Sequence, residues 1–324
     1  MSFSRSVFVH AGLAALAAVA AISVSVKDEN VRVIVHEATV VDARPADIQK
    51  VTFVGKAKTV TLEPRKDEIG PWFFGTIEKP APPSDASTPP QRTAFVSIAT
   101  GEKLFETLAP LKAIRDAGPV PSERLAELGL EKPEGTLKLT LKSGERVFEI
   151  GGPTPGGTDR YLRDPSSSRV YVVVGELLRD FEWAESRLLE RELHAWKESD
   201  IEKAKLVASD KSRQVLRQTK EGKTIWADAS SPDTNDETIG NFMQRLDRLR
   251  PSEYQEKLPE NRVTLVRLEL EGRKGPLGWV ELTKVPLEGD KADYFIASER
   301  TRLYGKVVAS LAQQVEQDIA SVVR

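Results

Sequence analysis

The chain has 324 residues, of which 40% are hydrophobic and 30% are charged, and it contains no cysteine. Its 47 Lys and Arg against 49 Asp and Glu give a formal net charge of −2, whereas nucleic-acid-binding proteins usually carry a basic excess. Composition therefore disfavours a nucleic-acid partner. The lack of cysteine excludes a disulfide scaffold, a cysteine zinc site and a thiol nucleophile.

The N-terminus carries the most specific local signal, an uncharged run of 21 residues that follows Arg5. At about 1.5 Å per residue in a helix, such a run is long enough to cross a bilayer core. We expect a cytoplasmic stub at 1–6, a single transmembrane helix (signal anchor) at 7–26 and the bulk of the chain in the periplasm. The alternative is a cleaved signal peptide, because residues 18–20 have the small-x-small form of a processing site. We favour the anchor, because apolar residues continue to Val26.

The rest of the sequence indicates two tandem copies of one module. Residues 46–53 and 199–206 have similar patterns and are offset by 153 positions. Each is followed by a turn, a strand, a charged turn and a second strand that contains a tryptophan, Trp72 or Trp226. We expect these two tryptophans at equivalent core positions.

Hydrophobic periodicity predicts the helices and hairpins of each copy. Amphipathic helices are expected over 102–116 and 237–251, where apolar residues recur at helical spacing. Residues 136–142 alternate between apolar and polar, which is typical of a half-buried strand that enters a hairpin. A closing helix is expected over about 175–189 in the first copy and 307–322 in the second.

These elements predict an α+β fold class. An N-terminal single transmembrane helix is followed by two tandem repeats, 27–196 and 197–324, each a β-rich module with two packed helices. The first repeat carries a Pro-rich stretch at 79–91. Because proline lacks a backbone N–H and disrupts both helices and central strands, we expect an exposed loop there.

The search for catalytic and binding motifs identifies no reaction centre. The glycine-rich residues 151–157 lack the Gly-Lys-Ser/Thr of a phosphate loop and are expected to form a loop between strands. His10 lies in the apolar run, and His36 has no neighbouring cysteine or histidine. His194 is expected in a packed linker between the repeats, where the Trp196 side chain fills the interior. We therefore predict no catalytic, cofactor-binding or metal-binding residue.

Four stretches of the first copy resemble a known bacterial family, namely residues 125–133 (LAELGLEKP), 136–152 (TLKLTLKSGERVFEIGG), 155–163 and 168–173. They are similar to a domain of unknown function typical of auxiliary proteins encoded beside ABC exporters, including those of the gliding-motility class. The resemblance covers most of 44–196. The second copy departs from the pattern at 258–261 and 285–289.

The resemblance implies a non-enzymatic accessory or adaptor subunit of an ABC-type export or motility system. The protein would be anchored in the inner membrane through residues 7–26, and its partner would be an ABC transporter permease or a related inner-membrane complex. No nucleic acid and no small-molecule cofactor is expected. The alternative is a protein that binds an envelope polymer, peptidoglycan or polysaccharide, in the groove between the repeats. An exported hydrolase is disfavoured.

Overall fold

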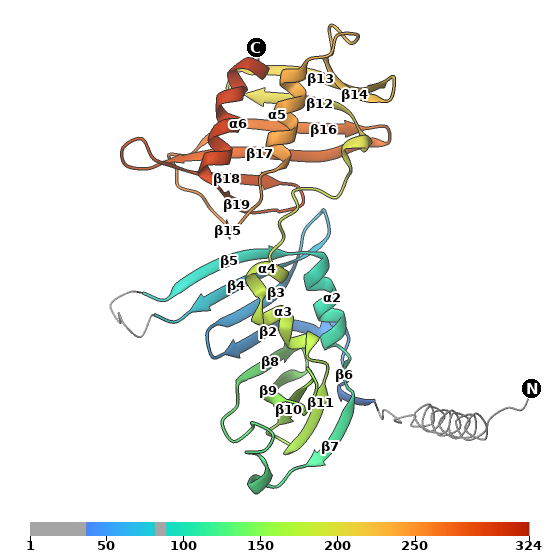
Figure 1. The fold of residues 1–324 in the computed structure, drawn as a ribbon, viewed down its shortest axis with the longest axis vertical. Coiled ribbons are helices and arrows are strands. Elements are labelled where there is room, and N and C mark those ends of the chain that lie inside the picture. The colour runs from blue at the N-terminus through green and yellow to red at the C-terminus, as the bar shows by residue number, and fades with distance from the viewer. Residues whose placement is uncertain (1–36, 82–88, 324) are drawn as a thin grey trace, which may run out of the picture.

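The computed structural model describes residues 37–81 and 89–323. They form two lobes, one above the other in the view of Figure 1. Of these residues, 47% lie in strands and 20% in helices, so the fold is mostly β and the predicted α+β class is wrong. The difference arises because each lobe is built on a large antiparallel sheet, whereas its helices are few and mostly short.

Several predictions fall partly or wholly outside the described residues. The stub at 1–6, the membrane helix at 7–26, His10 and His36 all do so. Within 37–81 and 89–323, no helix has both the length and the apolar character needed to cross a membrane. Of the predicted loop at 79–91, Lys79 is the last residue of a strand and Gln91 the first residue of the next.

The first lobe is a nine-stranded antiparallel sheet with helices packed on it (Figure 1). In order across the sheet, its strands are β7 (Arg115–Pro119), β11 (Arg169–Val173), β10 (Arg160–Asp164), β9 (Gly144–Pro153), β8 (Gly135–Leu141), β2 (Ile48–Gly55), β3 (Thr59–Lys66), β4 (Pro71–Lys79) and β5 (Gln91–Ser97). The remaining elements are α2 (Ala99–Leu108), α3 (Glu176–Glu182), α4 (Ala184–Arg187) and a separate strand pair, β1 (Ala38–Val41) with β6 (Leu111–Ala113). Strand β8 shows the period of two that forms such a sheet, since Leu137 and Leu139 are fully buried between half-exposed neighbours.

The second lobe has eight strands, with two helices across one face of the sheet (Figure 1). The strands are, in order, β15 (Glu253–Gln255), β19 (Tyr304–Val307), β18 (Ala292–Ser298), β17 (Gly275–Pro286), β16 (Val263–Gly272), β12 (Ile201–Ala208), β13 (Lys211–Lys220) and β14 (Lys223–Asp228). The helices are α5 (Glu237–Asp247) and α6 (Ala309–Val322). Helix α5 buries Ile239, Phe242 and Leu246 at the spacing of an amphipathic helix.

The two sheets are joined edge to edge. Ala94 of β5 pairs with Tyr254 of β15, which makes one continuous antiparallel sheet of 17 strands among the described residues. This sheet begins at β7 and finishes at β14.

Both outermost strands have interrupted edges. In β7, the register against β11 shifts, and the carboxylate of Asp116 accepts a hydrogen bond from the N–H of Gly118 at 2.8 Å. In β14, the backbone of Trp226 is already engaged. Its carbonyl accepts from the N–H of Asp236 at 2.7 Å, and its N–H donates to the side chain of Asn235 at 3.3 Å.

The two lobes repeat one order of elements. Strand β2 lies between β3 and β8, and β12 lies between β13 and β16 in the same antiparallel sense. A helix follows the early strands in each lobe, and further hairpins and a terminal helix follow it. A short 3-10 turn precedes β2 and β12, and in both turns a backbone N–H donates to an aspartate three residues on, Arg44 to Asp47 and Lys197 to Asp200.

The strand register corrects the predicted equivalence of Trp72 and Trp226. Phe73 lies opposite Pro64, and Trp226 lies opposite Arg217. Pro64 and Arg217 are 153 positions apart, so the counterpart of Trp226 is Phe73. Trp72 is one residue away and points to the other face of the sheet, because side chains alternate along a strand. Both tryptophans are nevertheless buried, at 6% and 4% exposure.

Two predicted helices differ from the structure in length. Helix α2 ends at Leu108, because the following Pro110 cannot continue a helical hydrogen-bond ladder. Leu111, which fits the helical pattern in the sequence, lies in β6 instead. In place of one helix over 175–189, the chain forms α3 and α4, which are separated at Trp183.

Arg213 connects the sheet of the second lobe to both of its helices. Its guanidinium donates to Asp228 at the end of β14 at 2.7 Å and to Asp236, the N-cap of α5, at 3.0 Å. It also donates to the carbonyl of Val322 at the end of α6 at 2.9 Å. Because the Arg213 side chain is only 14% exposed, these charge-assisted bonds are shielded from water and hold the helices in place.

Replacement of the core tryptophan should destabilise the second lobe strongly. Trp226 packs under α5, where a Cβ on Gly240 would lie 3.4 Å from its ring. Trp226→Ala should lower the free energy of unfolding by about 3–5 kcal/mol. The matched control is Trp183→Ala, because Trp183 is 61% exposed, and its loss should change stability by no more than about 0.5 kcal/mol. Urea unfolding followed by circular dichroism measures both, and equal costs would contradict this packing.

The Arg213 cluster also predicts a pH dependence. Hydrogen bonds from Ser230 and Arg213 lower the pKa of Asp228 to about 2. The stabilisation should therefore be complete above the ordinary aspartate pKa and be lost as the pH falls from about 4 towards 2. Asp228→Asn should flatten this part of the stability curve, whereas Asp210→Asn, in an exposed turn, should not. Thermal unfolding across the acidic range checks this, and a wild-type slope retained in Asp228→Asn would count against it.

Candidate functional site

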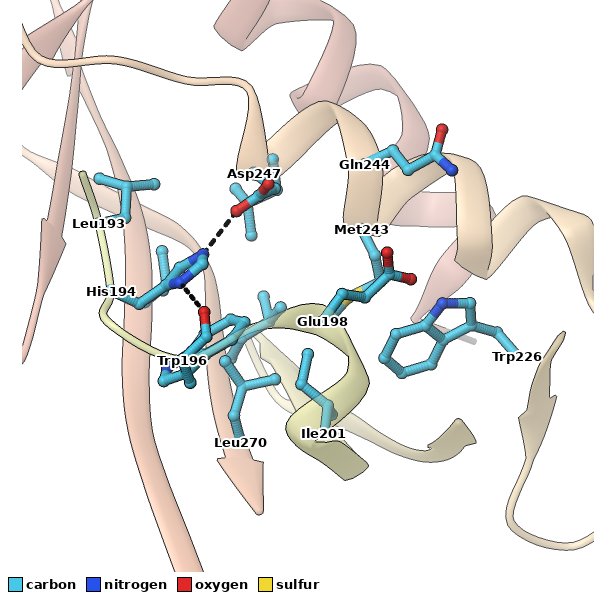
Figure 2. A pocket seen from close by; sticks show the side chains of 13 residues that line it. Leu193, His194, Trp196, Glu198, Ile201, Trp226, Met243, Gln244, Asp247 and Leu270 are labelled. Atoms are coloured by element: carbon cyan, nitrogen blue, oxygen red, sulfur yellow. Dashed lines mark hydrogen bonds and ion pairs between the residues drawn. The ribbon is translucent and has the colours of Figure 1, made fainter. Parts of the chain in front are cut away.

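The segment that connects the lobes, residues 190–197, covers a small apolar cavity in the second lobe (Figure 2). The preceding Leu189 belongs to the core of the first lobe, and Leu193 belongs to the core of the second. The cavity lies between this segment, α5 and the sheet, and Trp226, Met243, Leu246, Leu268 and Val280 are among its lining residues. Its volume is about 80 Å³, well below the roughly 300–1,000 Å³ of sites that enclose small-molecule ligands.

His194 sits at the mouth of this cavity, held on three sides. Its ring stacks on Trp196, with centroids 3.4 Å apart. Its Nδ1 lies 2.9 Å from the carbonyl oxygen of Trp196, and its Nε2 lies 2.6 Å from a carboxylate oxygen of Asp247 on α5. The hydrogen bond from His194 lowers the pKa of Asp247. With both ring nitrogens engaged, His194 is held as part of the packing of the connecting segment.

The arrangement around His194 does not assemble the groups of a triad or a metal centre. The cavity below it is lined mostly by apolar side chains. In the part of the chain that the structure describes, no group of three or more His, Cys, Asp or Glu residues is placed to hold a metal ion.

The motif residues 125–133 form a cover over the face of the first sheet that lies opposite its main core. Leu130 packs there with Tyr161, Val170 and Val172, and Leu125 and Leu128 lie against the same cluster. In the second lobe Leu258 covers Val285 and Phe295 in the same manner. The motif therefore has a packing role in both lobes, although its sequence differs in the second.

The glycines of the motif permit a close backbone contact. Gly129 has φ +67°, and a Cβ there would lie 2.6 Å from the N of Gly152. The N–H of Gly152 donates to the carbonyl of Leu128 at 2.9 Å. A Cβ on Gly129, or on Gly151, where it would lie 2.5 Å from the carbonyl oxygen of Leu128, would push the cover away from the hairpin. The glycine-rich residues 151–157 thus belong to the end of β9 and the turn that follows it.

The junction of the lobes contains a set of part-buried polar contacts between segments distant in sequence. The Tyr254 hydroxyl, in a side chain 2% exposed, donates to the carbonyl of Glu190 at 2.8 Å. Burial raises the pKa of Tyr254, so the hydroxyl stays a donor. Arg300 pairs with the Glu190 carboxylate at 2.7 Å. Arg302 pairs with Asp67, 235 positions earlier, at 3.1 Å.

Sequence reasoning missed these junction residues. Arginines in turns and a tyrosine in a short strand have no periodicity or motif that marks them as an interface. The sequence contains one indirect indication of the junction, the Pro-rich insertion of the first copy. This insertion separates β4 from β5, and β5 is the strand that pairs with the second lobe.

A shallow trough of about 500 Å³ lies on the sheet of the second lobe, over β12, β13, β16 and β17. Arg267 stacks on Trp279, with its guanidinium carbon 4.2 Å from the ring centroid, and pairs with Glu281 at 3.3 Å. Around them lie cross-strand pairs of opposite charge, Lys203 with Glu271 and Lys205 with Glu269. The trough is therefore open, and charged side chains of both signs surround its apolar lining.

Comparison with protein families identifies the family of this chain. Residues 99–264, just over half of the sequence, match the family described as Domain of unknown function (DUF4340). The chain belongs to the DUF4340 family. The match runs from α2 of the first lobe to the start of β16 in the second, and so it crosses the junction. Searches of curated proteins and of solved structures find no match. The DUF4340 match establishes the family alone. The predicted connection of this protein with ABC exporters stays a prediction.

The glycine contact in this DUF4340 chain can be tested with a matched pair. Gly129 and Gly156 both have positive φ, +67° and +71°, but a Cβ on Gly156 would meet nothing within 4 Å. Both alanine variants should share the cost of a strained backbone. Gly129→Ala should lose about 1–3 kcal/mol more, because it also forces atoms together. Urea unfolding measures the difference, and equal losses would show that the close approach to Gly152 is unimportant.

Proposed function

We propose that the protein is a non-enzymatic accessory or adaptor subunit of an ABC-type export or motility system, which acts by contact with an inner-membrane permease complex. The observation that carries this proposal is the locked junction. Two modules joined through a continuous sheet and buried polar contacts present their surfaces at a fixed spacing. Such a fixed spacing would let two contacts with one membrane complex reinforce one another.

The resemblance of residues 125–133 and 136–152 to exporter-auxiliary proteins supports the same partner. The position of the protein is part of the proposal: the inner membrane, with the folded lobes in the periplasm. It rests on the uncharged run of 21 residues in the sequence.

The junction also determines how the surfaces of the two lobes are coupled. Arg302 and Asp67 make two hydrogen bonds, at 3.1 and 3.4 Å, between the β18–β19 turn and the β3–β4 turn. Arg65 pairs with Glu256 at 3.1 Å on another strand of the same interface. The contacts come from separate turns and strands, so they oppose both bending and twisting of one lobe against the other.

Unlocking the junction should weaken partner capture while each lobe stays folded. The variant Tyr254→Phe with Arg302→Ala removes one hydroxyl and one guanidinium, and Arg273→Ala removes an exposed arginine from a turn of the second lobe as a control. If both lobes contact the complex, recovery of the permease from detergent-solubilised native membranes should fall by about tenfold, the factor given by ~1.4 kcal/mol. Quantitative mass spectrometry of the co-purified proteins measures this, and small-angle scattering checks that the lobes have become mobile.

Two outcomes would contradict the adaptor proposal. One is that the full-length protein recovers no ABC permease under conditions in which it remains intact. The other is that the unlocked variant, shown by scattering to be flexible, recovers the permease as well as the Arg273→Ala control does.

The open trough over Trp279 favours a second candidate function, the binding of an envelope polymer. The trough extends across four neighbouring strands, which suits an extended chain. An aromatic ring flanked by hydrogen-bonding side chains suits peptidoglycan or polysaccharide. Retention of the soluble lobes on insoluble peptidoglycan, abolished by Trp279→Ala, would support this function. It would replace the adaptor proposal if permease recovery were also absent.

A further inference from the structure

The outward surface of the last helix, α6, carries no charge. This helix buries Ala312, Val315 and Val322 against its own lobe. Its exposed residues are all uncharged, namely Ser310, Leu311, Gln313, Gln314, Gln317, Ala320 and Ser321. Because 30% of the whole chain is charged and the polar face of a solvated helix usually carries charge, this surface is unusual for the protein.

The two acidic residues of α6 are used within the second lobe. The carboxylate of Glu316 pairs with Lys284 of β17 at 2.8 Å and accepts a hydrogen bond from the hydroxyl of Tyr294 in β18. Asp318 pairs with Arg245 of α5 at 2.5 Å. Both acidic side chains are less than a third exposed, so the charge of the helix is turned towards its own lobe.

The other helices show that the fold does not require a neutral surface. Each of the other α-helices in the described ranges exposes charged residues: Glu102, Lys103 and Glu106 on α2, Glu176 and Arg179 on α3, Arg187 on α4, and Glu237 and Arg248 on α5. The helix layer of the first lobe, on a module of the same design, is therefore charged where α6 is neutral.

The exposed residues of α6 include a regular stripe. Ser310, Gln314, Gln317 and Ser321 follow one another at spacings of four, three and four residues, which places them on one face in the pattern of two packed helices. A glutamine amide both donates and accepts hydrogen bonds, and so does a serine hydroxyl. Such a stripe can satisfy an identical stripe, and it offers no charge with which to select a different surface.

We propose that α6 is a contact between two copies of this chain, packed antiparallel about a two-fold axis between Gln314 and Gln317. A two-fold axis pairs each surface with itself, so Gln314 of one copy lies opposite the partner's Gln317, and Ser310 lies opposite the partner's Ser321. Figure 1 shows α5 and α6 lying across one face of the second sheet. The exposure of the stripe shows that no other part of the described chain covers it.

The size of the helix determines the strength of this contact. The 14 residues of α6 form a rod about 21 Å long and roughly 10 Å wide. The resulting footprint of roughly 200 Å² is well below the about 800 Å² per partner of a stable interface. The dimer is therefore weak in free solution. It gains from confinement of both copies in one membrane, a step that rests on the proposed position of the protein.

Cysteine cross-linking of the full-length protein in native membranes tests the contact. Because the chain has no cysteine, a single introduced thiol has no background. Gln314→Cys and Gln317→Cys lie next to the axis, so a short bismaleimide should join two copies of either variant. Glu106→Cys, at an exposed position of α2, is the matched control and should give at least about fivefold less product. Mass spectrometry of the product identifies both chains.

A charge exchange tests the two-fold register. In a Gln317→Cys background, Ser310→Glu with Ser321→Glu places like charges opposite one another twice and should lower the yield of dimer about fivefold, the scale of two surface ion pairs. Ser310→Glu with Ser321→Lys places opposite charges there and should keep the yield. Circular dichroism confirms that each variant stays folded.

Three outcomes would overturn this inference. The first is a yield from both α6 cysteines no greater than that from Glu106→Cys. The second is cross-linking of α6 to a different protein in place of a second copy, which would assign the surface to the adaptor contact. The third is an equal effect of the two charge exchanges. Permease recovery is measured on the same membranes, so absence of the dimer with normal recovery overturns this inference and leaves the adaptor proposal standing.

Discussion

The buried hydroxyl of Tyr254 imposes the constraint on which the shape of this chain depends. A phenol enclosed by the two lobes must find an acceptor, because an unsatisfied polar group in the interior is costly. The acceptor is the carbonyl of Glu190, and it is in reach only when the connecting segment turns back against the first lobe. The N–H of the same Glu190 donates to Val96 of β5 at 2.7 Å. One residue of the connection thus ties together both lobes and the strand between them.

The difference between the two modules explains how this junction arose from a repeated design. After β4, the first module inserts the Pro-rich stretch and adds β5, whereas after β14 the second module passes through a short turn into α5. The added strand is the one that pairs with β15. Two otherwise similar modules are therefore joined through an element that one of them lacks, so the two edges at the junction are complementary and not identical.

Local patterns in the sequence predicted local structure well and long-range contacts poorly. Alternation over 136–142 corresponds to β8, and the helical pattern from Glu237 corresponds to the start of α5. The helix predicted to run to 116 ends at Leu108, because a proline stops a helix even where apolar residues continue at helical spacing. The predicted α+β class was wrong because far more residues lie in strands than in helices. The pairing of Arg302 with Asp67 could not be predicted, since no periodic signal connects residues so far apart in the chain.

The candidate site shows the same division. Sequence placed His194 and Trp196 in one linker because they are neighbours, but their third partner, Asp247, comes from the last turn of a helix some fifty positions later. The two hydrogen-bond acceptors beside His194 are brought together only by the fold, so neither the composition nor the local sequence could predict them.

The interrupted edges of β7 and β14 also set the limits of assembly. The outer strands of a large sheet ordinarily present unpaired backbone groups to which another strand can add. Here the bulge beside Gly118 and the engaged backbone of Trp226 disfavour regular pairing with a further strand. Both features disfavour further strand addition at the ends of the described sheet. The side chains on its faces and turns are then the surfaces best suited to contact other molecules, and individual substitutions there can alter such contacts without promoting strand-by-strand polymerisation.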